Sequence, residues 1–138
     1  MHFASAEQVL DSQSVMKTIG ARATKAEPGL VEIELPFADH LLQQHGFVHA
    51  GVITTIVDSA CGFAAMTLLP DGWNVLTVEF KVNLLAPAKG DRFVARGRVV
   101  KGGKTLTVCQ GEVSAFEGEK ETPIALMQAT MINLAPRT

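Results

Sequence analysis

The chain of 138 residues is 47% hydrophobic and 19% charged, and its formal net charge is −2. A chain of this length buries roughly two-thirds of the surface that it exposes when unfolded, so residues 1–138 are expected to form one domain without metal or disulfide staples. The hydrophobic fraction excludes intrinsic disorder, and the slightly acidic balance argues against a nucleic-acid partner.

The two cysteines, Cys61 and Cys109, have no companions at metal-ligand spacing. The sequence therefore predicts no metal site. The first residues show no basic segment followed by an apolar one, which a secretory leader would have. We expect a cytoplasmic protein with reduced thiols.

The first third of the chain contains three short predicted elements. Residues 6–18 have the spacing of a weak amphipathic helix. Residues 20–27 and 30–36 flank Pro28-Gly29, which has the composition of a turn, and they are expected to form a first β-hairpin.

Residues 46–70 are mostly apolar and include a single formally charged residue, Asp58. A transmembrane helix is one interpretation, but it would place Asp58 near mid-bilayer at a cost of a few kcal/mol, and the flanking residues are not basic. We instead predict a buried helix over residues 50–69, about 30 Å long, which Pro70-Asp71-Gly72 stops. A helix that is apolar nearly all round must be wrapped by other structure.

One stripe of this helix is small or polar, and Asp58 lies within it. A buried carboxylate is costly unless hydrogen bonds or charges compensate. Either the neighbouring hydroxyls of Thr54, Thr55 or Ser59 bind the carboxylate, or it caps a neighbouring element, or the acid has a chemical use. The stripe consists of Gly51, Thr54, Thr55, Asp58, Ser59 and Gly62.

Four strands are predicted after the long helix. In residues 74–87 the apolar side chains alternate with polar ones, so Leu76, Phe80 and their alternate neighbours are expected on the core face and Thr77 on the other. Residues 91–100, 105–116 and 122–134 follow after turn-like sequences and are expected to continue an antiparallel meander. The fold class is α+β: a curled antiparallel sheet of five to six strands wrapped around one long central helix.

The charge is unevenly distributed along the chain. Residues 1–80 have a net charge of −6, residues 81–104 of +6 and residues 105–138 of −2. So dense a basic segment could bind a phosphorylated small molecule, or it could equally be a solvated face of the sheet.

Four segments carry a family resemblance. They are Gln-Gln-His-Gly-Phe-Val-His-Ala-Gly at 43–51, Asp58, Phe-Lys-Val-Asn-Leu-Leu-Ala-Pro-Ala at 80–88 and Val-Lys-Gly-Gly-Lys-Thr at 100–105. Over residues 35–113 the chain resembles the hot-dog-fold acyl-CoA thioesterases of the PaaI-like type, within the 4-hydroxybenzoyl-CoA thioesterase superfamily. It departs from the family's usual His-Gly-Gly, because Ala50 replaces the first glycine.

The resemblance implies hydrolysis of an acyl-CoA to a free acid and CoA. Asp58 matches the family's acid on the long helix, where it either attacks the acyl carbon or takes a proton from the attacking water. Gln43 matches the amide residue that assists, and Thr77 resembles a residue that supports the nucleophile or its water. His49 either lies beside the thioester or simply caps the helix. No cofactor is implied, since coenzyme A is part of the substrate.

The thioester oxygen needs a hydrogen-bond donor as it becomes negative, and the helix N-terminus offers backbone N–H groups, that of Ala50 first. Asp58 lies about 12 Å further along the same helix at the standard rise. Donor and acid must both lie within about 3 Å of adjacent substrate atoms, so one subunit cannot supply both. We therefore predict a homodimer with antiparallel helices and two shared sites, and the resemblance implies the same arrangement, often within a tetramer.

The basic segment supplies candidate contacts to the phosphates of CoA, because the family's CoA contacts fall on these loops. The acyl group would enter the interior beside Phe63 and Met66. Two other functions stay open: a non-catalytic acyl-CoA-binding protein on the same fold, and a hydratase or dehydratase. The predicted substrate-binding residues are His49, Gly51, Thr77, Lys89, Lys101, Gly102, Gly103 and Lys104.

Overall fold

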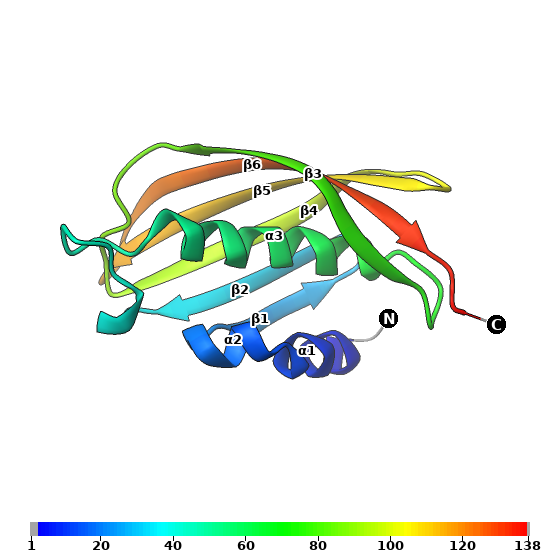
Figure 1. The fold of residues 1–138 in the computed structure, drawn as a ribbon, viewed down its shortest axis with the longest axis horizontal. Helices are drawn as coiled ribbons and strands as arrows, with labels where there is room; N and C mark the ends of the chain where they lie inside the picture. The colour runs from blue at the N-terminus through cyan, green and yellow to red at the C-terminus, as the bar shows by residue number, and fades with distance from the viewer. Residues whose placement is uncertain (1–2, 138) are drawn as a thin grey trace.

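The fold is seen in a computed structural model that describes residues 3–137. One long helix lies across one face of a six-stranded antiparallel sheet, and two short helices lie beside the first strands (Figure 1). The predicted α+β architecture is confirmed. The elements are α1 (Phe3–Ser12), α2 (Ser14–Ile19), β1 (Arg22–Glu27), β2 (Leu30–Pro36), a 3-10 turn (Asp39–Leu41), α3 (Ala50–Met66), β3 (Asn74–Leu84), β4 (Arg92–Gly102), β5 (Leu106–Glu117) and β6 (Lys120–Leu134).

The expectation about a secretory leader concerned the first residues of the chain. Of these, residues 1 and 2 lie outside the described range. Within it, no helix is long and apolar enough to cross a membrane.

The N-terminal helix is broken, whereas the sequence predicted one helix over residues 6–18. Gln13 is extended, with φ −71° and ψ 120°, and separates α1 from α2. Leu10 and Met16 are both buried in the core. On a continuous helix, residues six apart point about 120° apart, so the break is what turns both side chains inward.

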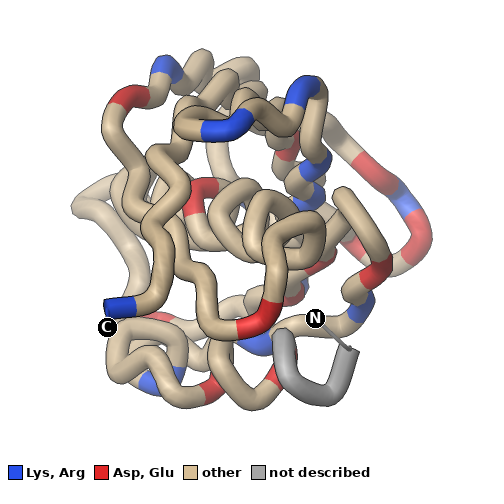
Figure 2. The backbone as a smooth tube through the Cα atoms, turned by 90° about the vertical axis from the view of Figure 1, so that its right-hand side faces the viewer, with Lys and Arg blue, Asp and Glu red and all other residues tan. Residues whose placement is uncertain are grey.

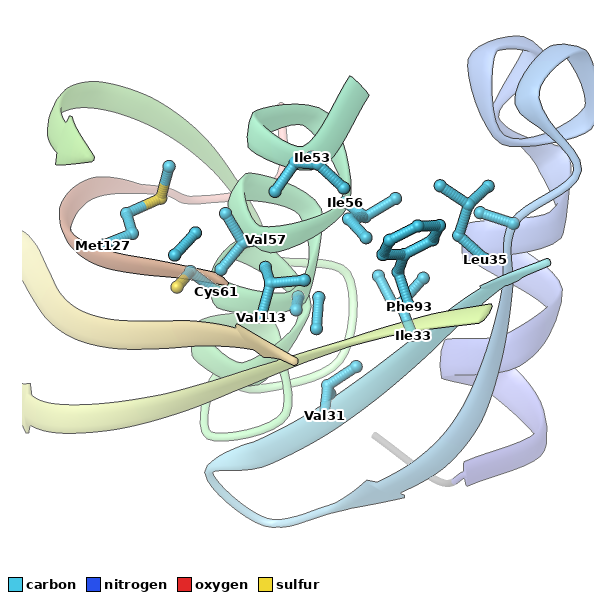
Figure 3. Close-up of a cluster of buried hydrophobic side chains, with 14 of the residues drawn as sticks. Val31, Ile33, Leu35, Ile53, Ile56, Val57, Cys61, Phe93, Val113 and Met127 are labelled. Atoms are coloured by element: carbon cyan, nitrogen blue, oxygen red, sulfur yellow. The ribbon is translucent and has the colours of Figure 1, made fainter. Parts of the chain in front are cut away.

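The central helix packs one of its sides against the sheet. Ile53, Ile56 and Val57 are fully buried there, against β-strand residues such as Phe93 and Val113 (Figure 3). We call this the packed side of α3. The helix is three residues shorter than predicted: it ends at Met66, and the following turn is tied to the β1–β2 hairpin by a 2.8 Å hydrogen bond from the Gly29 N–H to the Thr67 hydroxyl.

Two paired glycines of the sheet let the packed side approach closely. Gly97 on β4 lies directly opposite Gly111 on β5. A Cβ on Gly97 would overlap the backbone of Ala60 and Cys61, and a Cβ on Gly111 would lie 2.5 Å from Cγ2 of Val57. Only glycine fits under the helix at these two positions.

The predicted four-strand meander is wrong at its first strand. The sheet order is β1-β2-β4-β5-β6-β3, so β4, β5 and β6 form a meander while β3 lies at the far edge beside β6. The strand also ends at Leu84 rather than at residue 87. The chain then crosses the end of the sheet, where the Leu85 N–H bonds to the carbonyl of Ile124 and the Ala88 carbonyl accepts from Val48.

The predicted alternation in β3 is confirmed from Phe80 onward but is wrong before it, because a β-bulge at Val78 shifts the register. Thr77 pairs with buried Met131, and Phe80 pairs with buried Ala129, so both lie on the helix face of the sheet. Leu76 faces away and is 60% exposed. The bulge thus brings Thr77 to the same face as the apolar residues from which the sequence pattern separated it.

Candidate active site

The predicted site residues fall into two separate pockets of one protomer. A pocket of about 610 Å³ at the N-terminal end of α3 is lined by Gln43, His49 and Ala50, together with residues of the 84–88 segment. A second pocket, of about 420 Å³, is lined by Asp58 and Thr77. None of the described residues lines both pockets.

The N-terminus of α3 leaves one backbone donor open. His49 is the N-cap residue, and its Nδ1 accepts a 2.8 Å hydrogen bond from the Gly51 N–H. Among residues 3–137, no acceptor is bonded to the N–H of Ala50. His49 therefore has the capping role that the sequence left as an alternative, and Ala50, rather than Gly51, has the N–H that remains available to a ligand.

Gln43 shapes the loop in front of this helix. Its Oε1 accepts hydrogen bonds from the N–H groups of His45 (2.6 Å) and Phe47 (3.3 Å). The loop thereby fixes the side chain of Gln43, and its amide NH₂ is the group left to face the pocket that it lines. Gln43 is thus more than a solvated loop residue.

Asp58 lies on the side of α3 that the sheet does not cover. The Thr77 hydroxyl on β3 donates a 2.7 Å hydrogen bond to its Oδ1. The hydroxyls of Thr54 and Thr55 instead donate to carbonyls of their own helix, those of Ala50 and Gly51. The carboxylate is therefore oriented from a neighbouring strand, and the alternative that Thr54 or Thr55 binds it is wrong.

The small and polar stripe forms this open side of α3. Gly51 is exposed and the others are half-buried, so Asp58 is not fully buried, contrary to expectation. Figure 2 shows α3 nearly end-on, with a single acidic segment. The open side consists of Gly51, Thr54, Thr55, Asp58, Ser59 and Gly62.

Apolar and polar residues line the pocket beside Asp58 in about equal number. Phe63 and Met66, which the sequence placed at the acyl entrance, are among its walls. The helix α1 also contributes Val9, which the sequence did not single out. No local pattern reveals that contact, because only the tertiary fold brings α1 under the second half of α3 (Figure 1).

Most arginines of the basic segment form ion pairs with glutamates of other strands. Arg96 pairs with Glu32 at 3.1 Å and with Glu121 at 3.2 Å, and Arg92 lies 3.7 Å from Glu34. These pairs lie on the face of the sheet away from α3. This part of the segment is the solvated sheet face that composition left as an alternative.

The lysines predicted to bind CoA lie in two places. Lys101 and Lys104 flank the turn between β4 and β5, whereas Lys89 precedes β4. Because β4 spans 11 residues, these places are about 30 Å apart in one protomer. Within the described residues, none of the three lysines forms an ion pair.

The turn between β4 and β5 is held by a buried asparagine that the sequence did not single out. Asn133 Nδ2 donates to the carbonyls of Gly103 (2.9 Å) and Lys104 (3.2 Å), and its Oδ1 accepts from the Thr107 hydroxyl (2.8 Å). Gly102 and Gly103 therefore lie in a fixed turn. Their backbone geometry is set by β6 as well as by their own sequence.

The cysteines lie on the packed side and are unsuited to chemistry. Burial raises the pKa of Cys61 far above its ordinary value, and the nearby Cys109 and Asp58 add to the shift. Burial raises the pKa of Cys109 to about 11. Both thiols are neutral at physiological pH, so neither is a candidate nucleophile.

The sequence of this chain is similar to those of known proteins. Residues 45–122 match the sequence profile of the Thioesterase superfamily. A protein of Saccharolobus solfataricus that is named as an esterase is 33% identical over 113 residues, which cover 80% of this chain and 72% of that protein.

Solved structures are similar along nearly the whole chain. A thioesterase family protein from Silicibacter pomeroyi is 47% identical, with a TM-score of 0.93 and coverage of 97% of this chain and 99% of that one. The PaaI protein of E. coli, from the phenylacetic acid degradation operon, is 18% identical, with a TM-score of 0.86 and coverage of 97% and 94%. The second likeness is one of fold alone.

Proposed function

The chain belongs to the thioesterase superfamily and has the hot-dog fold, and on that premise we propose that it hydrolyses acyl-CoA thioesters with Asp58 as nucleophile or general base. The observation that carries the proposal is the 2.7 Å hydrogen bond from Thr77 to Asp58 in a pocket that the apolar side chains of Phe63 and Met66 also line. It holds a single carboxylate, on an otherwise uncharged helix, in a defined orientation.

The reaction needs one carboxylate and one water molecule. Either Asp58 takes a proton from water as the water attacks the acyl carbon, or Asp58 attacks that carbon and water then cleaves the resulting anhydride. In both routes the carbon–sulfur bond breaks and CoA leaves as its thiolate, which then takes up a proton. Thr77 keeps one carboxylate oxygen engaged and leaves the other free to react.

The N–H of Ala50 is the proposed donor to the thioester oxygen. It lies at the positive end of the α3 dipole, and no acceptor in the described chain competes for it. Alanine keeps the N–H that a glycine would supply, so the departure from His-Gly-Gly preserves this role. Gln43, held by its loop, contributes an amide donor on the same side.

Ala50 and Asp58 of different subunits are proposed to share each site, with β3 as the contact between subunits. Within the described residues β3 pairs on one side only, and it exposes Leu76, Val78 (55%) and Phe80 along that edge. Such an apolar edge strand favours pairing with a second copy. Since Thr77 marks the Asp58 pocket and Leu84 lines the Ala50 pocket, antiparallel pairing centred near Phe80 brings the two pockets of different subunits together.

The same two-fold arrangement gives the separated lysines a common role. Lys89 lies near the Ala50 end of α3, and the turn with Lys101 and Lys104 lies beyond its other end. Antiparallel helices bring the first lysine of one subunit toward the other two of its partner. Together they suit the separate phosphate groups of CoA, because lysine binds phosphate as a mobile point charge.

The proposal is tested by hydrolysis of a panel of acyl-CoAs by the wild type and Asp58→Asn. We expect kcat to fall by about 10²- to 10⁴-fold in the variant, because it loses the catalytic carboxylate. Asp11→Asn, which removes an exposed carboxylate from α1, is the matched control and should leave kcat unchanged. Wild-type turnover that survives in Asp58→Asn contradicts the role of Asp58, and CoA binding without any turnover identifies a binding protein instead.

The shared site is tested by mixing subunits. Ala50 is the first residue of α3, where proline is tolerated, so Ala50→Pro removes the N–H without breaking the helix. Each single variant should be inactive, and a mixture with Asp58→Asn should regain activity from one intact site per mixed dimer. Absence of recovery after proven subunit exchange contradicts a site shared between subunits.

A further inference from the structure

The cavity beside Asp58 is closed on one side by α1, outside the segment that matches the superfamily profile. Val9 and Ser12 of α1, and Gln13 just after it, line the cavity together with Phe63 and Met66 of α3. Leu10, next to Val9, is 1% exposed and is packed in the core. The core therefore fixes α1, which holds Val9, itself 38% exposed, in the wall.

Gly62 leaves room in this cavity, although no close packing contact requires glycine at this position. A Cβ at Gly62 would have Val75 Cγ2 as its nearest neighbour, at 3.8 Å, which is an ordinary van der Waals contact. Glycine inside a helix costs roughly 0.5–1 kcal/mol relative to alanine. Gly97 and Gly111 are explained by close packing, whereas Gly62 is explained by the space that it leaves beside Asp58.

The dimensions of the cavity limit what can occupy it. Asp58, Gly62 and Met66 succeed one another at helical spacing along its wall, so the wall extends about 12 Å from the carboxylate. The volume is about 420 Å³, and apolar side chains, those of Phe63 and Met66 among them, make up about half of the lining. A two-carbon acyl group leaves most of this space empty, and a chain much longer than about 12 Å does not fit along this wall.

We propose that this cavity is the acyl subsite, that it takes apolar acyl groups of medium length such as hexanoyl and octanoyl, and that Val9 and Gly62 determine that length. This inference rests on the proposed thioesterase function. Gly62 supplies the width next to the reacting carbon, and Val9 on α1 forms the end wall.

The test measures kcat/KM for acetyl-, butanoyl-, hexanoyl-, octanoyl- and palmitoyl-CoA. The wild type should be most active on hexanoyl- and octanoyl-CoA. Gly62→Ala should lower the octanoyl-to-acetyl ratio by about tenfold or more, since one displaced methylene changes discrimination by that factor. Its thermal midpoint should not fall, because the added methyl meets no close atom and alanine favours the helix.

The end wall is tested by changing α1. Val9→Trp should shift the preferred acyl group to a shorter one, and Val9→Ala to a longer one. Val15→Trp is the matched control, since Val15 is an exposed valine, on α2, that does not line the cavity; it should leave the profile unchanged.

The outcomes separate the two proposals. Suppose that the wild type hydrolyses thioesters and Asp58→Asn does not. If the Val9 and Gly62 variants then change kcat/KM by the same factor for every acyl length, the proposed subsite is wrong and the proposed function stands. A wild type most active on acetyl- or palmitoyl-CoA also overturns the subsite. If no thioester is hydrolysed, or Asp58→Asn is fully active, the proposed function itself fails.

Discussion

Glycine has opposite roles on the two sides of α3. On the packed side, Gly97 and Gly111 of the sheet allow helix and strands to touch, and no further atom can be added. On the open side, Gly62 of the helix itself faces a cavity that has room for more atoms. Substitutions on the packed side are therefore expected to change stability, and substitutions on the open side are expected to change activity.

The largest expected effect is on the packed side. Gly97→Ala forces a Cβ into the backbone of α3 at Ala60, where no side-chain rotation relieves the overlap. We expect a loss of about 3 kcal/mol or more in the free energy of unfolding, at or above the upper end of ordinary overpacking. Urea denaturation measures it.

The control for this variant is on the same strand. Gly102→Ala adds a Cβ with no atom within 4 Å and should change stability by about 0.5 kcal/mol or less. Equal stability of Gly97→Ala and Gly102→Ala would mean that α3 does not pack on the paired glycines.

A smaller effect is expected on the open side, at the hydrogen bond that orients Asp58. Thr77→Val keeps the shape of the side chain and removes the hydroxyl that donates to Oδ1. Hydrogen bonds to charged groups contribute about 1.5–3 kcal/mol, so kcat should fall about tenfold or more.

The split between kinetic constants distinguishes orientation from substrate binding. KM should change little in Thr77→Val, and Thr77→Ser, which keeps the hydroxyl, should retain most of the wild-type kcat. A fall confined to KM, or an equally inactive Thr77→Ser, would contradict an orienting role for Thr77.

The smallest expected effect is a pH dependence of stability from the packed side. Burial raises the pKa of the Cys109 thiol from 9.0 to about 11 in the folded protein. Between these values the unfolded chain loses its thiol proton while the folded chain keeps it, so stability present below pH 9 falls as the pH rises toward 11. This should amount to about 1 kcal/mol by pH 10.

Urea denaturation at about pH 8 and about pH 10 measures this effect. Cys109→Ala should lose less stability over that range than the wild type, because one of the two buried thiols is gone. An identical loss in both proteins would show that Cys109 does not contribute.

Local patterns predicted the elements whose partners are their neighbours in sequence. The first hairpin and the β4–β5–β6 meander form where turn compositions connect alternating strands. The long helix and its lone acid were also evident, because Asp58 is the one charged residue in α3. The predicted site residues came from motifs and a family resemblance, and their roles stay predictions until the experiments above are done.

The sequence by itself determined the α+β class, the central helix and the residues offered for chemistry, because hydrophobic periodicity and turn composition are local properties. The tertiary structure decided three other matters: β3 lies at the far edge of the sheet, the bulge at Val78 turns Thr77 toward Asp58, and α1 closes the cavity near Gly62. Each depends on contacts between segments far apart in the chain. Such contacts are chosen by the packing of the whole core, and no short stretch of sequence encodes them.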